Sequence, residues 1–400
     1  MRDLKMEDFR YELPDHRIAR FPLSDRSASK LLVLREEEIS EVLFGELPGY
    51  FGEQDLLVMN DSKVIRARLV FTRTSGARIE VFLLEPADPA EYAGAFASRG
   101  SCSWHCLVGN LKKWKEESLM VTSANAEIRL YARRGSPGGT ITFSWEPPEL
   151  SFAEVVEQMG ETPIPPYLNR SPEVIDSQRY QTVYARVEGS VAAPTAGLHF
   201  TPAIIENLVR NGTSVERLTL HVGAGTFAPV KSATVADHLM HQEWVSIPAP
   251  LVRRLTDTDC RITALGTTTL RSLESLYWLG LLLREGKDEP AEGWHIRQWL
   301  PYEKHDEPGT RECLGIVAEY LDRMKLDSIK FRTGLILVPG YRFRMADRLI
   351  TNFHQPGSTL LLLVAAFAGE HWKQVYRYAL DNDFRFLSYG DGSLLYLHKS

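Results

Sequence analysis

Cysteine is scarce in this sequence, with four among 400 residues and no C-x-x-C spacing between them. Structural zinc ribbons and disulfide frameworks are therefore disfavoured. Long apolar runs are also missing. The longest, residues 359–368, falls well short of the roughly 20 residues of a transmembrane helix and is better interpreted as a buried helix. The N-terminus lacks the apolar core of a secretory signal, so a cytoplasmic protein is expected.

An excess of basic charge is absent as well. Lys and Arg number 46 against 52 Asp and Glu, a formal net charge of −6. This balance disfavours a generic nucleic-acid coat protein, because such proteins bind by neutralising many phosphates. The G-x-S-x-G elbow, the Walker loop and the S-x-x-K motif are missing too, so the commoner hydrolase and NTPase classes lose support. What remains is the ordinary composition of a folded protein, long enough for two or three domains.

A block of short extended segments fills the region between residues 62 and 149. They are β-branched or aromatic and are separated by Gly, Ser and Asp, and Pro147-Pro148 closes the block. The clearest of them are residues 68–72, 78–83, 104–108, 127–131 and 140–143. Short strands with frequent turn signals predict a small all-β barrel or sandwich.

The rest of the chain alternates between helical and extended patterns. Helices are expected at residues 152–159, 202–210, 270–282 and 359–368, and strands at 215–221, 261–265, 335–338 and 349–350. Such alternation predicts an α/β layer with a mixed or parallel sheet. We therefore expect an α/β main domain made of residues 1–61 and 150–400, with the β-barrel of residues 62–149 inserted into it.

Two glycine-containing loops carry polar groups. Residues 191–200 are small apart from a few positions, so the backbone there can approach a ligand closely; a tight crossing between packed elements is the alternative. Residues 219–227 contain a G-x-G turn that lacks the third glycine of a dinucleotide fingerprint, yet it can place amides against an anion or a ribose. His221 in this loop is either structural or catalytic.

Three further segments lie where α/β folds place their ligands. Residues 266–274 form a strand-to-helix junction whose free amides and threonine hydroxyls suit a carboxylate or phosphate, with simple helix capping as the alternative. Residues 351–356 and 385–391 interleave polar groups with aromatic rings, either as ligand contacts or as ordinary turn formers. His238 and His241 lack the H-E-x-x-H spacing and a nearby cysteine, so no metal is expected there.

Basic residues concentrate in the β block, and Trp114 lies among its lysines. On an acidic chain this predicts either an RNA-backbone surface with a stacking aromatic ring or a solvated barrel face. The basic residues that would contact RNA are Lys63, Arg66, Arg68, Lys112, Lys113 and Lys115.

Taken together, these segments resemble the S-adenosylmethionine:tRNA ribosyltransferase-isomerase family of queuosine biosynthesis. The resemblance is collinear and covers residues 8–14, 60–65, 180–184, 191–200, 220–227, 238–243, 266–275, 351–369 and 384–391. It implies an α/β domain with a smaller β-barrel domain. It also implies transfer and rearrangement of the ribosyl part of S-adenosylmethionine onto 7-aminomethyl-7-deazaguanine at the tRNA wobble position. The product is epoxyqueuosine, and adenine and methionine are released.

This chemistry requires proton transfers, which histidine performs near neutral pH. The residues expected to be catalytic are His199, His221, His354 and Asp391, without distinction between base and acid. The residues expected to bind the cosubstrate S-adenosylmethionine are Thr195, Gly197, Gly223, Gly225, Thr226, Thr267, Thr268, Arg271 and Tyr389. Among these, Thr267, Thr268 and Arg271 would hold the methionine carboxylate. The expected partner is tRNA carrying the deazaguanine precursor, bound by a monomer.

Some positions depart from the family pattern, notably Ser62, Lys63, Arg66 and Gly392, and residues 285–330 are expected to be an atypical insertion in the main domain. An enzyme with an altered acceptor is therefore one alternative. A noncatalytic RNA-binding paralogue is a second, and a hydrolase or metal enzyme using the histidines is a third.

Overall fold

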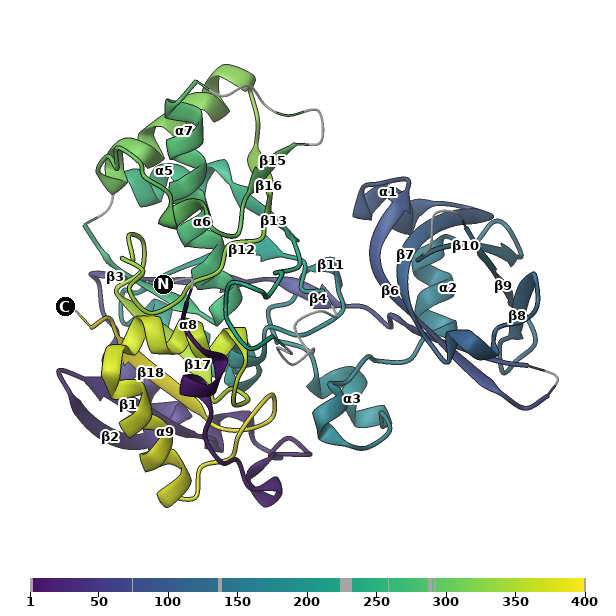
Figure 1. The fold of residues 1–400 in the computed structure, drawn as a ribbon, viewed down its shortest axis with the longest axis horizontal. Helices are drawn as coiled ribbons and strands as arrows, with labels where there is room; N and C mark the ends of the chain where they lie inside the picture. The colour runs from purple at the N-terminus through teal and green to yellow at the C-terminus, as the bar shows by residue number, and fades with distance from the viewer. Residues whose placement is uncertain are drawn as a thin grey trace.

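The computed structural model describes residues 3–73, 75–135, 139–223, 232–257, 259–286, 290 and 293–398. Its ribbon forms two lobes of unequal size (Figure 1). The larger lobe holds both chain ends and a ten-stranded sheet, and the smaller lobe holds a six-stranded sheet. Between them, β4 (Ser62–Val64) pairs in parallel with β11 (Val187–Ser190). Within the described ranges, none of the helices combines the length and hydropathy needed to cross a bilayer.

The larger sheet mixes parallel and antiparallel pairs. Its spatial order is β15 (Trp294–Ile296), β16 (Ser328–Thr333), β13 (Glu243–Pro248), β12 (Ser214–Leu220), β3 (Asp55–Asn60), β14 (Arg261–Leu265), β17 (Arg348–Asn352), β18 (Gly392–Tyr396), β1 (Lys30–Arg35) and β2 (Glu38–Leu43). The central strands β12, β3, β14 and β17 are mutually parallel, and the outer strands add antiparallel pairs. The predicted mixed α/β sheet is confirmed.

Helices cover both faces of this sheet, as parallel strands require. The helices of the larger lobe are α3 (Val174–Arg179), α4 (Pro202–Arg210), α5 (Ala249–Asp257), α6 (Thr267–Arg284), α7 (Thr310–Met324), α8 (Thr359–Ala368) and α9 (Trp372–Asp381). Because side chains alternate along a strand, Leu56 and Val58 of β3 join the core beneath α6, whereas Leu57 and Met59 join the core beneath α4. The buried sequence of β3 thus serves two cores.

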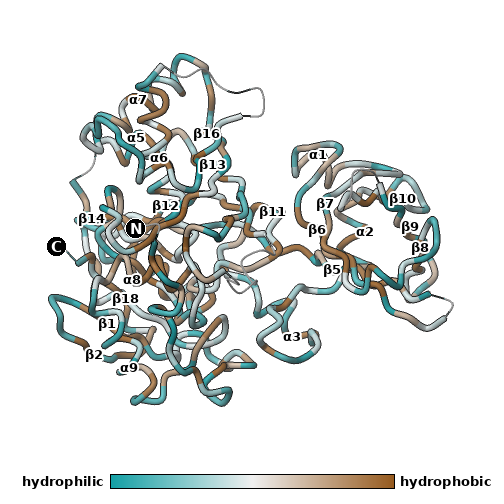
Figure 2. Tube along the Cα trace, viewed as in Figure 1, coloured by the Kyte–Doolittle hydropathy of each residue, from teal (hydrophilic) through white to brown (hydrophobic). Residues whose placement is uncertain are grey.

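The smaller lobe is a nearly closed antiparallel barrel. Its strands, in spatial order, are β5 (Arg68–Thr72), β6 (Arg78–Asp88), β7 (Ser101–Gly109), β10 (Thr140–Glu146), β9 (Arg129–Arg134) and β8 (Ser118–Thr122). Helix α1 (Tyr92–Ala97) follows β6, and α2 (Phe152–Met159) packs its buried face against the barrel interior. Hydrophobic stretches run through both lobes, and hydrophilic residues mark outer turns such as the one between β1 and β2 (Figure 2). The predicted barrel is confirmed.

Two details of the sequence interpretation were wrong. Residues 335–338 are irregular rather than a strand, because the amide of Leu335 donates to Thr333 Oγ1 and that of Ile336 to the carbonyl of Gln298. Strand β8 was not anticipated. The predicted domain boundaries stay predictions, and the packing of α2 carries the barrel core past residue 149.

The predicted insertion at residues 285–330 is packed closely into the larger lobe. Strand β15 extends the main sheet through its pairing with β16. Helix α7 packs on α6, where a Cβ on Gly280 would lie 2.4 Å from the carbonyl oxygen of Cys313. Residues 287–289 and 291–292 lie outside the described residues.

Candidate active site

A pocket opens at the carboxyl ends of β14 and β17, where an α/β sheet is expected to bind its ligands. We call it the strand-end pocket. Its walls are Tyr167, Tyr180, residues 192–196, Val222, residues 266–268, residues 351–355, residues 358–360, Leu387 and Ser388. Segments far apart in the sequence therefore meet at one site, as the sequence interpretation required.

A second pocket adjoins the first and shares four of its residues, Thr267, Thr268, Thr359 and Leu360. Its other walls are Met240, His241, Arg271, residues 335–337 and Leu363. Most of these side chains are apolar, and His241 and Arg271 add an imidazole and a charged group. The two pockets together form one crevice with polar groups around the start of α6.

Two helices begin at this crevice. Gly266 precedes α6 with φ of +90°, a backbone conformation that favours glycine, and no side chain caps the helix there. The start of α8 is capped by Ser358, which accepts from the amide of Leu361 at 3.2 Å. Because helix N-termini carry partial positive charge and unpaired amides, the first turn of α6 favours an anion.

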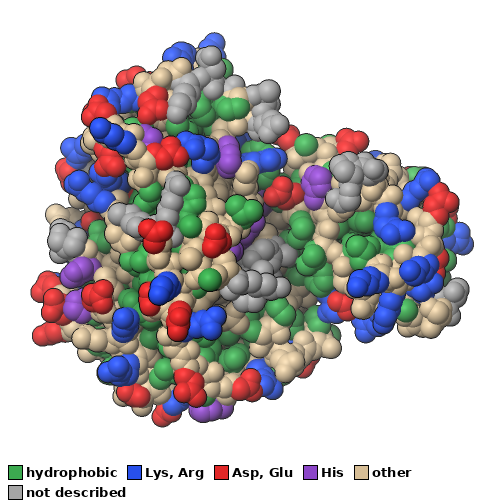
Figure 3. Space-filling view, viewed as in Figure 1, with side chains coloured by type: hydrophobic (Ala, Val, Ile, Leu, Met, Phe, Trp, Pro, Cys, Tyr) green, Lys and Arg blue, Asp and Glu red, His purple; other side chains and the backbone are tan. Residues whose placement is uncertain are grey.

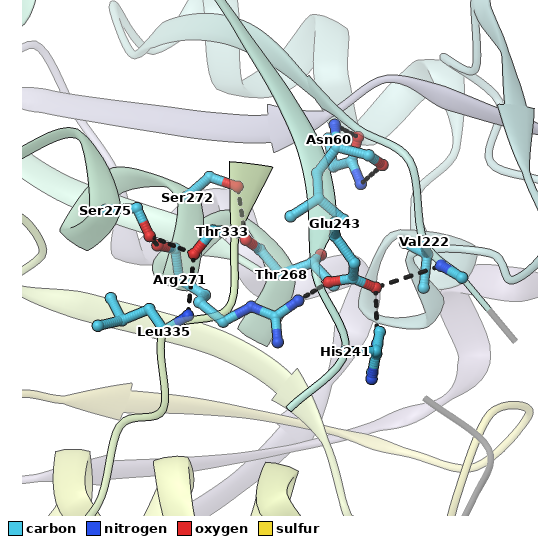
Figure 4. Close-up of polar contacts among 12 residues, drawn as sticks. Asn60, Val222, His241, Glu243, Thr268, Arg271, Ser272, Ser275, Thr333 and Leu335 are labelled. Atoms are coloured by element: carbon cyan, nitrogen blue, oxygen red, sulfur yellow. Dashed lines mark hydrogen bonds and ion pairs between the residues drawn. The ribbon is translucent and has the colours of Figure 1, made fainter. Parts of the chain in front are cut away.

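Arg271 on α6 forms a buried ion pair with Glu243 at the start of β13 (Figure 4). Glu243 Oε1 also accepts from the amide of Gly223 and from His241 Nε2, each at 3.2 Å. Burial lowers the pKa of Arg271 to about 10, so the guanidinium stays charged at neutral pH. Its charge is balanced by Glu243, and the pair connects three segments beside the crevice.

His354 is the predicted catalytic histidine that lines the strand-end pocket. Its Nε2 lies 2.9 Å from Thr351 Oγ1. Its amide donates to Tyr376 Oη at 3.0 Å, and its carbonyl accepts from Tyr11 Oη at 2.5 Å. Burial lowers the pKa of His354 to about 3, so the imidazole is neutral at pH 7.

His199 lies behind the pocket wall rather than in it. Its Nδ1 is 3.0 Å from Ser29 Oγ and its Nε2 is 3.1 Å from Asn352 Nδ2. The ring centroid lies 4.6 Å from that of Phe44. Burial, followed by the charges of Arg385 and Arg26, lowers the pKa of His199 to about 3. This neutral ring is linked to the pocket wall through its contact with Asn352.

His221 and Asp391 do not line the pocket. The ring of His221 stacks on Tyr92 of the barrel lobe, with centroids 4.2 Å apart, and burial lowers its pKa to about 4. Asp391 accepts from the amides of Lys30 and Arg385 at 3.0 and 2.7 Å, and burial raises its pKa. Asp391 therefore holds the loop that presents Leu387 and Ser388 to the pocket.

The remaining residues predicted to bind the donor fall into four groups. Thr195, Thr267 and Thr268 line the strand-end pocket. Gly197 and Tyr389 do not line it. A Cβ on Gly197 would lie 2.0 Å from Tyr184 Oη, so this glycine permits close packing. Tyr389 Oη donates to Asp176 Oδ1 at 2.7 Å. Gly223 is held by Glu243, whereas Gly225 and Thr226 lie outside the described residues.

Several pocket residues were missed from the sequence. They are Tyr167, Tyr180, Asn352 and Ser388. Each of them lies in or next to a segment that stands out in the sequence. However, the tyrosines, the asparagine and the serine at these positions do not form a recognisable catalytic or binding motif. Tyr167 Oη and Ser388 Oγ form a short hydrogen bond that joins two of these segments across the pocket. For Tyr167, the two preceding prolines at positions 165 and 166 are the sequence feature that could have drawn attention to this residue.

The basic residues of the barrel lobe are interspersed with acidic ones (Figure 3). Lys63 pairs with Glu188 at 2.8 Å and Arg66 with Glu157 at 3.4 Å. Arg68 pairs with Glu80 at 2.8 Å and with Glu161 at 3.2 Å. Lys112, Lys113 and Lys115 are exposed on the barrel. The expectation of a stacking aromatic was wrong, because Trp114 is only 2% exposed.

Metal-capable side chains are spread apart: among the residues that the structure describes, no group of three or more His, Cys, Asp and Glu is placed to hold a metal ion.

Comparison with known proteins gives one consistent result. A family model described as queuosine biosynthesis protein matches residues 6–395. A curated relative from Geotalea uraniireducens, named S-adenosylmethionine:tRNA ribosyltransferase-isomerase, is 36% identical over 400 residues, 98% of this chain and 100% of the relative. A relative of the same name from Thermotoga maritima is 36% identical, with 98% and 100% of the two chains covered.

A solved structure was also matched, the crystal structure of S-adenosylmethionine tRNA ribosyltransferase from Thermotoga maritima. It is 28% identical, has a TM-score of 0.47, and the match covers 97% of this chain and 99% of that one. The family assignment depends on the sequence matches, which span nearly the full length of both partners. On that ground, the chain belongs to the queuosine biosynthesis protein family.

Proposed function

We propose that this chain is a tRNA-modifying transferase-isomerase. It transfers and rearranges the ribosyl moiety of S-adenosylmethionine onto 7-aminomethyl-7-deazaguanine at the tRNA wobble position, giving epoxyqueuosine and releasing adenine and methionine. The single observation that carries the proposal is the full-length similarity to relatives named for this activity. The convergence of Thr195, Thr267, Thr268 and His354 on one pocket supports it.

The start of α6 is the proposed site for the methionine carboxylate of the donor. The first-turn amides and the hydroxyls of Thr267 and Thr268 border both parts of the crevice. The helix dipole favours a carboxylate there. Arg271 adds less than a free cation would, since Glu243 balances its charge. We therefore propose that the amides contribute most of the binding energy and that Arg271 shapes the wall beside them.

His354 is the proposed proton acceptor. A sulfonium acidifies the carbon next to it, so a neutral imidazole at the pocket wall suits removal of the 5′ proton. The contact between His354 Nε2 and Thr351 Oγ1 fixes one ring nitrogen, which leaves Nδ1 for the transfer. The roles first expected for His199, His221 and Asp391 are replaced in this proposal by structural or positioning roles, because none of them lines the pocket.

The proposed tRNA contact lies on the barrel side. A groove between the lobes is lined by Lys63, Arg66, Gln181 and Glu188, and it shares Tyr180 with the strand-end pocket. An extruded wobble nucleotide could reach the donor past Tyr180. Lys112, Lys113 and Lys115 are exposed at one end of the barrel and are the proposed contacts to the RNA backbone, whose affinity depends on such cations.

We further propose that the protein acts in the cytoplasm as a monomer and needs no metal ion. Adding a chelator should therefore leave its turnover unchanged.

The direct test is release of adenine from S-adenosylmethionine in the presence of tRNA carrying the deazaguanine precursor. A matched reaction contains the same tRNA with unmodified guanine at the wobble position. The proposal expects adenine to accumulate in step with modified tRNA in the first reaction only. Binding of the tRNA without adenine release would favour the noncatalytic paralogue instead.

A further inference from the structure

Asn352, the last residue of β17, has an orphaned acceptor at the wall of the strand-end pocket. The residue is 2% exposed and borders the pocket. Its nitrogen Nδ2 lies 3.1 Å from His199 Nε2 and 3.4 Å from the carbonyl oxygen of Asp391. Among the described residues, its oxygen Oδ1 has no hydrogen-bond partner. Leaving a buried carbonyl oxygen unpaired is energetically costly, so an orphan in a pocket wall points to a donor on the ligand.

The orientation of this amide follows from its neighbours. The backbone carbonyl of Asp391 can only accept, so the nitrogen of Asn352 must face it. His199 Nε2 must then be the unprotonated ring nitrogen, and Nδ1 carries the proton that it donates to Ser29 Oγ. The lowered pKa of His199, caused first by burial, agrees with an uncharged ring. The carbonyl of Asp391 thus fixes which atom of Asn352 is left free, and His199 accepts from the same nitrogen.

The position of Asn352 relative to α6 indicates the donor. Strands β14 and β17 are parallel neighbours in which Leu265 pairs with Ile350, and the amide of Gly266 donates to the carbonyl of Ile350 at 2.8 Å. Thr267 and Asn352 each lie two residues beyond this pair, on backbones roughly 4.8 Å apart at the strands. A carboxylate bound at Thr267 therefore brings the ammonium group on the same carbon atom towards Asn352.

We infer that Asn352 Oδ1 accepts a hydrogen bond from the α-ammonium group of the donor's methionine, and that His199 is a positioning residue that aims this amide. The inference rests on the proposed function, since it assumes S-adenosylmethionine in the strand-end pocket. It divides recognition of the amino-acid head group between two strand ends. The start of α6 binds the carboxylate, and Asn352 binds the ammonium.

The test compares S-adenosylmethionine with the analogue in which hydrogen replaces the α-amino group. Binding of each to the full chain is measured by calorimetry. The wild type should bind S-adenosylmethionine about 10-fold or more tightly than the analogue, the range of a hydrogen bond to a charged group. Asn352→Leu should lose that preference while its affinity for the analogue changes little. Equal affinity of the wild type for both ligands would overturn the inference, whether or not the variant folds.

The role of His199 is tested with two variants. His199→Gln retains an amide oxygen able to accept from Asn352 Nδ2, whereas His199→Leu does not. The inference expects the Gln variant to keep the preference for S-adenosylmethionine and the Leu variant to lose most of it, at matched thermal stability. Equal preference in both variants would show that His199 only fills space.

The two proposals fail in different ways. Selective binding of S-adenosylmethionine without adenine release in the presence of precursor tRNA would count against the proposed function alone. Adenine release by a wild-type protein that does not distinguish the deaminated analogue would count against the role of Asn352 alone.

Discussion

Arg271 on α6 and Glu243 at the start of β13 form a buried ion pair at the edge of the crevice, and each side chain is less than a tenth exposed. A cation expected to bind the donor is therefore already balanced by a carboxylate from another strand. Glu243 also holds the amide of Gly223 and the ring of His241, so its loss would affect more than Arg271.

Glu243→Gln should destabilise the protein by about 3 kcal/mol, because removing one partner leaves a buried charge unpaired. The free energy of unfolding is measured by urea titration. As a matched control, Asp259→Asn removes an exposed partner of Arg311 and should leave the unfolding midpoint unchanged. Equal stability of the Glu243 variant and the wild type would mean that the pair does not hold this region together.

His354→Gln should lower kcat by about 100-fold or more with little change in the affinity for S-adenosylmethionine, as expected for loss of a general base. Single-turnover adenine release and calorimetric binding give the two quantities. His16→Gln changes an exposed histidine and serves as the control. An unchanged kcat would remove His354 from the mechanism.

His221→Phe should keep turnover within a few-fold of the wild type. The phenyl ring preserves the stack on Tyr92, and His221 does not line the pocket. His221→Ala should weaken the contact between the lobes and lower the melting temperature. A loss of kcat in the Phe variant as large as that of His354→Gln would restore the catalytic role that the sequence suggested.

Stability should fall as the pH is lowered below about 6.5. The pKa values of His199 and His354 are about 3 in the folded state against 6.5 in the unfolded state, so the unfolded chain binds more protons between these limits. Each histidine should remove about 2 kcal/mol of stability between pH 7 and pH 5. Urea titrations at both pH values measure the loss, and His354→Gln should reduce it. A larger or equal loss in that variant would contradict the assignment.

Replacing Lys112, Lys113 and Lys115 together by Gln should weaken tRNA binding and reduce the dependence of log Kd on log salt by about 2, because fewer phosphates are neutralised. Filter binding at several salt concentrations measures both effects. Arg129→Gln is the control, since that side chain already pairs with Glu146 at 3.0 Å. A parallel salt dependence for the triple variant and the wild type would place the RNA elsewhere.

Most of the fold could be predicted from the sequence because the patterns that identify helices, strands and turns are local. Short β-branched or aromatic segments with turn signals between them identified the barrel, and alternating helical and extended patterns identified the α/β sheet. Residues 335–338 were predicted to be a strand because their apolar run resembles a buried strand. In the structure, the backbone amides of residues 335 and 336 donate to a threonine hydroxyl and to a loop carbonyl instead of to a neighbouring strand. Such pairing depends on distant residues that periodicity does not reveal.

The site could be predicted from the sequence only in part. Thr267, Thr268 and His354, which the sequence pointed to, line the pocket because they follow strand ends, and their roles stay predictions. His199 was expected in the pocket because its loop is lined with small residues, but the ring turns to Ser29 and leaves Asn352 at the surface of the pocket. Which of two neighbouring polar side chains faces a cavity is decided by tertiary packing, and no spacing rule encodes it.

The central claim is most directly tested by mass spectrometry of the wobble nucleoside after incubation with S-adenosylmethionine and precursor tRNA. The account predicts that the deazaguanine nucleoside gains the rearranged ribosyl unit as epoxyqueuosine, with one adenine and one methionine released per tRNA. A precursor nucleoside of unchanged mass, from a folded protein that binds both substrates, would contradict it.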